Sequence, residues 1–365
     1  MKLVVLGLSL SSSWGNGHAV TYRALLRALA ARGHDILFLE RETPWYAAAR
    51  DVLEPDYCRL AFYGAVAELE RWRREIETAD AVMVGSFTPE GLAVGRWVQE
   101  AALGVRIFYD IDTPVTLAAL ERDACEYLSS ELIGGYDLYL SFTGGPTLEA
   151  LEQRWGAPAA RVLYCSADPE LHRPIEQDKR WDLAYLGTYG PDRQAALEKL
   201  LLEPARQAPD LAFVVAGSLY PETIDWPANV ERIEHVAPGD HPAFYAQSRF
   251  TLNVTRADMV RAGFSPSVRL FEAALCGCPI LSDSWPGLST LFKPGAEIAV
   301  VESAEAVLSL LRHVDGDRRH AWAAAARRRA LDAHTAAHRA GELEALIEAA
   351  ALSPSASVAF RPAVA

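Results

Sequence analysis

Short apolar runs alternate with amphipathic stretches along most of the chain. The runs have the length of strands, and because nearly every position in them is apolar they predict strands buried on both faces. The intervening stretches have the period of helices, and strands alternating with helices predict a parallel, doubly wound sheet. In the first half we expect strands at residues 2–8, 35–40, 81–87, 105–110, 137–142 and 161–166, and helices at 19–32 and 89–103.

The alternation stops at a polar, nonperiodic segment, ADPELHRPIEQDKRW (167–181), and then restarts, which predicts two domains joined by a linker. In the second half we expect strands at 182–187, 211–216, 250–254, 279–283 and 297–301, and helices at 191–203, 241–247, 266–276, 304–313 and within 317–351. The expected organisation is an N-terminal domain at 1–170, a C-terminal domain at 171–335, a last helix at 336–352 that crosses back to the first domain, and a disordered tail at 353–365.

With 50% hydrophobic and 23% charged residues, the composition is that of a folded globular protein. The length of 365 residues is too great for one ordinary hydrophobic core and suits two domains. The net charge of -13 disfavours a nucleic-acid partner, whose phosphates need basic patches. No apolar run approaches the ~20 residues that span a bilayer. The apolar start MKLVVLGLSL lacks a small-residue cleavage site and is interpreted as the first strand, so we expect a cytoplasmic protein.

Two domains that face each other place the carboxyl ends of both sheets at one cleft, where open α/β sheets bind ligands. Loop 9–18, SLSSSWGNGH, follows the first strand, and Asn16 and Gly17 form a turn whose N–H groups can face an anion or an acceptor hydroxyl. The GxGxxG fingerprint is absent, which counts against a nicotinamide enzyme. His18 is either a general base, because its ordinary pKa is near neutrality, or a residue with a structural hydrogen bond.

The segment FYDIDTP (108–114) places Asp110 and Asp112 at the end of a strand. Side chains two apart on a strand share a face, so both carboxylates can hold a divalent cation against a diphosphate. Alternatively, Asp112 caps the next helix and Asp110 bonds to backbone. In a third interpretation Asp112 contacts sugar hydroxyls.

In the second half, LGTYGPDR (186–193) leads from a strand into a helix. Gly187 lets backbone approach a ligand, Thr188 offers a hydroxyl, and Arg193 has a planar fork suited to phosphate oxygens. Gly217, in VAGS at the end of the next strand, leaves room for a base or ribose.

The stretch NVTRADMVRAGFSPSVRLFEAALCGCPILSDSWPGL (253–288) is the most informative. Ser265 and Ser267 flank the start of a helix, whose free N–H groups suit a diphosphate. Arg269 in its first turn opposes the helix dipole, which favours an anionic partner. Glu272 lies on an apolar helix and needs a polar partner, either a ribose diol or a neighbouring arginine.

This stretch resembles the GT-B glycosyltransferases of the class called glycosyl transferases group 1, with the CgeB-like branch as the closest look-alikes. GNGHAVTYRALLRALAARGHD, LYCSADPELHRP, DLAYLGTYGPDRQ and DAHTAAHRA extend the resemblance over nearly the whole chain. It implies an α/β fold of two facing Rossmann-like domains with parallel sheets and a C-terminal helical segment. It also implies a hexosyltransferase-type enzyme that moves a sugar from a nucleotide-sugar, with a UDP-sugar favoured, to an acceptor.

By this resemblance Glu272 binds the donor ribose and Asp112 touches the transferred sugar. Gly187, Thr188, Arg193, Ser267 and Val268 lie around the diphosphate, the last two through backbone N–H groups. Such enzymes stabilise the diphosphate with helix N-termini and basic side chains, so we expect no metal cofactor. The first of the two glutamates usual in the class falls on Phe264 here, and Asp258 is the candidate for a displaced acid.

Most of the class retains the configuration of the sugar, and the leaving phosphate then accepts the acceptor's proton. An inverting enzyme needs His18 or Asp112 as base. The rival functions are a GT-B epimerase or hydrolase of sugar nucleotides and a non-catalytic, two-lobed binding protein.

Overall fold

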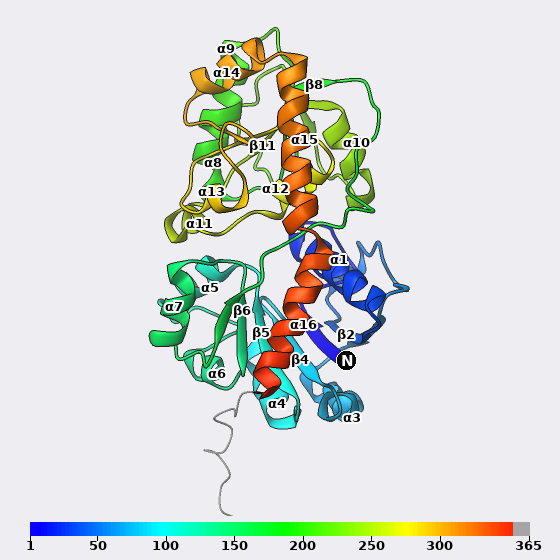
Figure 1. Cartoon of the computed structure of the whole chain (residues 1–365). Helices are drawn as coiled ribbons and strands as arrows, with labels where there is room; N and C mark the ends of the chain where they lie inside the picture. Colours follow the sequence, from blue (N-terminus) through cyan, green and yellow to red (C-terminus); the bar gives the residue numbers. More distant parts are fainter. Residues whose placement is uncertain (353–365) are drawn as a thin grey trace, which may run out of the picture.

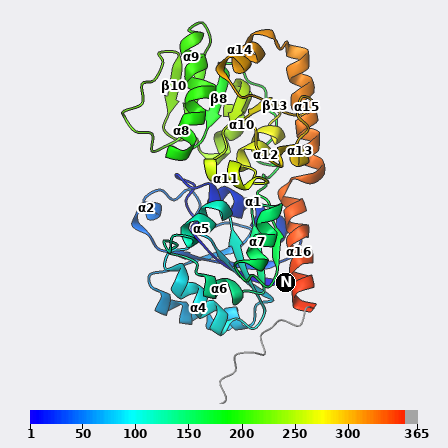
Figure 2. The same ribbon diagram turned by 90° about the vertical axis from the view of Figure 1, so that its left-hand side faces the viewer.

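The computed structural model describes residues 1–352. Two lobes, each a parallel sheet with helices on its faces, are stacked along the long axis of the molecule (Figures 1 and 2). The predicted disordered tail at 353–365 lies outside the described residues. Within residues 1–352 no helix is long and apolar enough to cross a bilayer.

The first sheet has seven parallel strands in the order β3-β2-β1-β4-β5-β6-β7. Its central strands are apolar on both faces, as in VVL of β1, and are fully covered. The strands are β1 (Lys2–Gly7), β2 (Asp35–Arg41), β3 (Arg59–Tyr63), β4 (Ala81–Gly85), β5 (Val105–Asp110), β6 (Leu138–Ser141) and β7 (Ala160–Val162). The helical segments are α1 (Gly17–Ala31), α2 (Pro44–Ala47), η1 (Val66–Trp72), α3 (Arg73–Glu77), α4 (Gly91–Ala101), α5 (Thr113–Leu120), α6 (Ser130–Gly134) and α7 (Pro146–Gln153).

The second sheet has six parallel strands in the order β10-β9-β8-β11-β12-β13. They are β8 (Trp181–Leu186), β9 (Phe213–Ala216), β10 (Val230–Ile233), β11 (Ser248–Asn253), β12 (Ile280–Ser282) and β13 (Ala299–Val300). The helical segments are α8 (Pro191–Leu197), η2 (Glu198–Leu202), α9 (Glu203–Gln207), η3 (Pro238–Asp240), α10 (His241–Ala246), α11 (Ala257–Ala262), α12 (Val268–Leu275), α13 (Leu288–Leu291) and α14 (Ala304–His313). The order of both sheets reverses direction beside the first strand, which creates a switch point for a ligand.

Two edge strands, β3 and β10, are absent from the prediction. Each has a neighbour on one side only, so polar residues such as Arg59, Glu231 and Arg232 are tolerated there. Their sequences, RLAFY and VERI, therefore lack the continuous apolar run that marks a buried strand.

The chain ends in two helices, α15 (Gly316–Ala333) and α16 (Ala336–Leu352), which lie along different lobes (Figures 1 and 2). Helix α15 packs on α12 of the second lobe, whereas α16 packs on α1 of the first. Leu343 and Ile347 are buried in that contact, and Glu344 forms ion pairs with Arg32 and His34. At the junction Thr335 forms a parallel bridge with Ala167, so the two chain crossings between the lobes lie side by side.

Candidate active site

A cavity of about 510 Å³ lies between the lobes, at the carboxyl ends of both sheets. The loops after β1 and β5 form one wall, and the loops after β8, β9 and β11 with the start of α12 form the other. The residues predicted from the sequence that line it are Asn16, Gly17, His18, Asp112, Gly187, Thr188, Arg193, Gly217, Ser267, Val268, Arg269 and Glu272. The lobes thus bring together residues that lie up to 256 positions apart, from Asn16 to Glu272.

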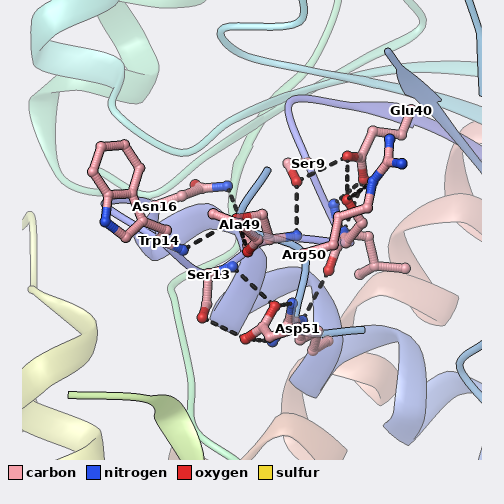
Figure 3. A network of polar contacts seen from close by, with 12 residues as sticks. Ser9, Ser13, Trp14, Asn16, Glu40, Ala49, Arg50 and Asp51 are labelled. Carbon is pink, nitrogen blue, oxygen red and sulfur yellow. Dashed lines mark hydrogen bonds and ion pairs between the residues drawn. The ribbon is translucent and has the colours of Figure 1, made fainter. Parts of the chain in front are cut away.

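The loop between β1 and α1 is held by Glu40, a fully buried residue at the end of β2 (Figure 3). Its carboxylate accepts hydrogen bonds from the amides of Leu10 (2.6 Å) and Ser11 (2.8 Å). It also accepts from the hydroxyls of Ser9 (3.0 Å) and Ser11 (2.6 Å). One carboxylate therefore fixes three consecutive residues of the loop.

A second carboxylate, Asp51, holds the next part of the same loop (Figure 3). It accepts from the amide (3.2 Å) and the hydroxyl (2.6 Å) of Ser13 and forms an ion pair with Arg23. Partial burial acts to raise the pKa of Asp51, but the bonds from Arg23 and Ser13 bring that pKa below its ordinary value. Glu40 and Asp51 are absent from the sequence prediction.

Asn16 acts as the cap of α1. Its Oδ1 accepts from the amide of His18 at 3.0 Å and its Nδ2 donates to the carbonyl of Ser12 at 3.2 Å. Gly17 follows, and apart from its chain neighbours and the backbone of its own helix no atom of the described residues lies within 4 Å of the position that a Cβ would take there. The space beside Gly17 is therefore open and belongs to the cavity.

His18 and Asp112 face each other at the cavity wall, with 3.7 Å between His18 Nε2 and Asp112 Oδ2. Among residues 1–352 the buried Nδ1 of His18 has no hydrogen-bond partner. Asp112 precedes α5, yet its side chain accepts no capping bond from the amides of that helix. Asp112 thus occupies the N-cap position of α5 without a side-chain capping bond, and its carboxylate lines the cavity instead.

Asp110 points the other way. It is fully buried, and its carboxylate accepts from the hydroxyls of Tyr139 and Thr116 and from the amide of Asp112. Burial raises the pKa of Asp110 to about 6. Only Asp112 lines the cavity, so the two carboxylates do not face one common point there, and the backbone bond of Asp110 is confirmed.

Two glycines let the loops after β8 and β9 pack tightly. Gly217 has φ +149°, and a Cβ there would collide with the carbonyl of Gly187. A Cβ on Gly187 would lie 2.6 Å from Arg269 Nη2. Close packing of the two loops therefore requires a glycine at position 217, whether or not this glycine also makes room for a ligand.

Arg193 lies in the first turn of α8, and its side chain reaches back over the loop between β8 and α8. Its Nη2 donates to the carbonyl of Thr188 at 2.5 Å, and within residues 1–352 its Nε is unpaired. The guanidinium is therefore fixed at the cavity wall with hydrogen-bonding capacity left for an anion.

Helix α12 begins later than predicted, at Val268, with Ser267 as its cap; the Ser267 hydroxyl accepts from the amide of Arg269 at 3.4 Å. Arg269 is buried against the ring of Tyr185 and donates to the carbonyl of Leu186 and to Asn253 Oδ1 (3.2 Å). Ser265 does not line the cavity, contrary to the prediction. It is fully buried and accepts a hydrogen bond from Thr143 of the other lobe at 2.9 Å.

Glu272 lies on the inner side of α12, 3% exposed, at the floor of the cavity. His172 Nε2 is 3.6 Å and His241 Nδ1 is 3.5 Å from its carboxylate, and the hydroxyl of Tyr245 donates to it at 3.4 Å. Burial acts to raise the pKa of Glu272, but His241 and the other positive groups outweigh it and lower the pKa to about 2. The alternative partner, a neighbouring arginine, forms no ion pair with Glu272 among the described residues, and two histidines lie there instead.

Arg256, after β11, also lines the cavity and was missed by the sequence prediction. It donates to Asp192 at 2.9 Å and lies 3.7 Å from Asp112 of the other lobe. Burial acts to lower the pKa of Arg256, but the two carboxylates raise it above its ordinary value. A guanidinium therefore bridges the lobes at the cavity.

Phe264, which stands where the class usually has its first glutamate, packs between the two lobes. Phe264, at φ 49°, packs its ring against Gly145 of the first lobe and Gly287 of the second. Asp258, the candidate for a displaced acid, pairs with Arg261 and does not line the cavity. Within the described residues neither position supplies the missing carboxylate to the site.

Comparisons with known proteins agree with this architecture. Residues 193–345 match a family model described as Glycosyl transferase-like. Similar solved structures include a sucrose-phosphate synthase from Thermosynechococcus elongatus (16% identity, TM-score 0.68), which covers 96% of this chain and 100% of its own. Anabaena HepE in complex with UDP-glucose has 14% identity and TM-score 0.71, with 96% of this chain and 100% of that chain covered.

An alpha-glucosyltransferase in complex with UDP-glucose and DNA has 11% identity and TM-score 0.74, with coverage of 95% and 99%. No curated protein matches the sequence.

The chain has the GT-B fold.

The predicted fold class is thus confirmed, whereas the CgeB-like branch stays a prediction. Because one GT-B neighbour was solved with DNA, the comparisons do not support the expected exclusion of nucleic acid.

Proposed function

We propose that this GT-B protein is a glycosyltransferase that moves a hexose from a UDP-sugar to an acceptor. One observation carries the proposal: Glu272 and the start of α12 share a cavity with His18 and Asp112 of the opposite lobe. A donor on one wall and an acceptor on the other would meet between them. The match of residues 193–345 to a glycosyltransferase-like model and the UDP-glucose complexes of similar structures support the same conclusion.

The donor binds to the second lobe. Glu272 accepts hydrogen bonds from the ribose hydroxyls, and the amides of Ser267 and Val268 face the diphosphate at the positive end of α12. Arg193 and Arg256 add positive charge on the same wall. They stabilise the charge that grows on the leaving phosphate.

In the reaction the acceptor oxygen forms a bond to the anomeric carbon as the bond from that carbon to the phosphate oxygen breaks, and the bonding pair leaves with UDP. We propose retention, in which the acceptor's proton goes to the leaving phosphate. The alternative is inversion, in which His18 and Asp112, 3.7 Å apart, would act together as the base. The anomer first released when water replaces the acceptor, followed by NMR, distinguishes the two outcomes.

The reaction requires no divalent cation in this proposal, because Asp110 is turned away from Asp112 and arginines face the diphosphate site. Protein treated with a chelator is expected to keep its full rate of donor turnover. Loss of turnover that Mg²⁺ or Mn²⁺ restores would contradict this. Five free cysteines, which fit a reducing compartment, support a cytoplasmic location.

Replacement of Glu272 by Gln tests the donor site. Charge-assisted hydrogen bonds contribute about 1.5–3 kcal/mol each, so loss of one lowers UDP affinity by about 10- to 150-fold. Calorimetric titration with UDP and with UDP-glucose measures it, and ADP and GDP serve as competing bases. Glu302→Gln, an exposed position on the same lobe, is the control.

Three outcomes would count against the proposal. Unchanged UDP affinity in a folded Glu272→Gln variant removes the ribose assignment. Tight donor binding with no sugar released to any acceptor or to water favours a binding protein, and turnover to an epimer or free sugar in the presence of acceptors favours the epimerase or hydrolase.

A further inference from the structure

Three potential metal ligands converge beneath the cavity: His172, His241 and Glu272. One ring nitrogen of each histidine and one carboxylate oxygen of Glu272 all lie within 4.8 Å of one another, and all three residues are buried. They come from the segment between the lobes, from the start of α10 and from α12. Within residues 1–352 this is the one such group of three or more His, Cys, Asp or Glu residues.

The two histidine nitrogens that face Glu272 have no hydrogen-bond partner among the described residues. His172 is 1% and His241 7% exposed, so both rings are shielded from bulk solvent. His172 Nδ1 lies 3.2 Å from the carbonyl of Asp168, to which it donates its proton. In the neutral ring, Nε2 therefore carries a lone pair directed at an ionised carboxylate.

His241 faces the same carboxylate. Its Nδ1 lies 3.5 Å from Glu272 and has no hydrogen-bond partner among the described residues. The carbonyl of Asp168 orients the ring of His172, as backbone carbonyls commonly orient histidines that bind metals. Two buried imidazole nitrogens and a carboxylate that lie this close together form a set of potential cation ligands.

The spacing suits zinc. Zinc bonds of 2.0–2.1 Å to nitrogen and oxygen in a tetrahedron place neighbouring donors about 3.3 Å apart. His172 Nε2 lies 3.6 Å from Glu272 Oε1, and His241 Nδ1 lies 3.5 Å from Oε2 of the same carboxylate, so each nitrogen–oxygen pair is close to that edge. Glu272 and His241 also line the main cavity, so the fourth position opens toward it.

We propose that His172, His241 and Glu272 bind one divalent transition-metal ion of the zinc type, and that the bound ion inhibits the enzyme by taking Glu272 from the donor ribose. Metal binding stands on the three side chains alone, whereas inhibition rests on the proposed function. The site regulates donor binding and takes no part in sugar transfer, so it is compatible with turnover in a chelator.

Cobalt tests the site, because Co²⁺ in a tetrahedral protein site absorbs visible light strongly. We expect chelator-stripped, full-length protein to develop this absorption at one equivalent of Co²⁺ and to lose it when Zn²⁺ is added. X-ray absorption of the zinc-loaded chain should show two imidazoles and a carboxylate in the first shell. This measurement needs no variant and decides the ligands even if a substituted chain fails to fold.

His172→Gln and His241→Gln should each weaken Co²⁺ binding by at least about 100-fold, since loss of an outer-shell partner alone costs 10–100-fold. His313→Gln is the matched control, because His313 is an exposed histidine that also contacts a carbonyl, that of Ser309. Cobalt binding that survives both cluster substitutions, or that the control abolishes, overturns the proposal. Octahedral cobalt without imidazole does so too.

UDP titrations separate this proposal from the proposed function. With Zn²⁺ at ten times its dissociation constant, the apparent Kd of UDP should rise about tenfold in the unaltered chain and stay constant in a folded His172→Gln variant. Capture of UDP by free zinc is equal in both samples. If UDP fails to bind in chelator, the proposed function fails while the cobalt spectrum still decides the metal site. Equal zinc effects on both proteins overturn the inhibition.

Discussion

Substitution of Glu40 tests how the acceptor-side loop is held. Glu40→Gln keeps the shape of the side chain but replaces a carboxylate that accepts four hydrogen bonds with an amide that has one oxygen. The remaining oxygen can accept from the amides of Leu10 and Ser11, while the NH₂ group must donate to the hydroxyls of Ser9 and Ser11, which then reverse. The geometry of the network can survive, but without the charge.

The magnitude follows from the difference between bonds to charged and to neutral acceptors. Bonds to charged groups contribute about 1.5–3 kcal/mol and neutral ones about 0.5–1.5 kcal/mol, so each bond weakens by about 1 kcal/mol. Relief from burying a charge offsets part of the sum, and we expect a net loss of about 2–4 kcal/mol. Glu40→Ala should lose more, because two buried amides then have no acceptor.

Hydrogen exchange measures this loss where it occurs. A loss of about 2–4 kcal/mol raises the equilibrium constant for local opening of the loop by about 30- to 900-fold. The amides of Leu10 and Ser11 should therefore exchange faster by this factor in Glu40→Gln. Glu42→Gln is the control, because Glu42 pairs with Arg50 at the exposed side of the same strand end and should change exchange by less than about fivefold. UDP affinity, a property of the other lobe, should stay constant. If Glu40→Gln exchanges as slowly as the unaltered chain, relief of the buried charge outweighs the hydrogen bonds and the reasoning fails.

Two further predictions concern a buried acid and the lobes. Burial raises the pKa of Asp110 from 3.8 to about 6. Between these pH values the folded chain holds a proton that the unfolded chain has released, so the contribution of this carboxyl to stability falls as pH rises. The difference in unfolding free energy between Asp110→Asn and the unaltered chain should therefore shift by about 2 kcal/mol in favour of the variant as pH rises from about 4.5 to 7.5. A difference that does not change with pH in denaturant titrations would contradict this prediction. The lobes should close on donor, because the cavity lies between them and Arg256 bridges them; small-angle scattering should show a smaller radius of gyration with saturating UDP, and an identical profile counts against closure.

The sequence predicts this fold well because buried parallel strands and amphipathic helices leave direct patterns. Helix 304–313 was predicted with the bounds of α14, and the central strands of both sheets were found. The edge strands β3 and β10 were missed, since exposure on one side permits charged residues. Helix α12 was predicted to begin two residues early, at Pro266, whereas Ser267 is its cap.

Site residues were predictable where they follow a strand directly, as Asp112, Gly187 and Gly217 do. They were not predictable where the role of a residue depends on contacts with residues that are distant in the sequence. Glu40, in the charged run ERE, has the pattern of an exposed strand end, yet loop 9–11 covers it completely. His172 and His241 lie 69 residues apart in polar segments, and only the fold of the second lobe aims both at Glu272.

The last helix has a consequence for the continuity of each folding unit. Because α16 covers α1 with Leu343 and Ile347, the first lobe is built from two separate pieces of the chain, and the second lobe lies between them as an insertion. A chain that stops after α15 would thus leave the second lobe complete and uncover apolar surface on the first, at the opposite end of the sequence. During synthesis on the ribosome the N-terminal lobe must wait, partly uncovered, until the C-terminal lobe has emerged.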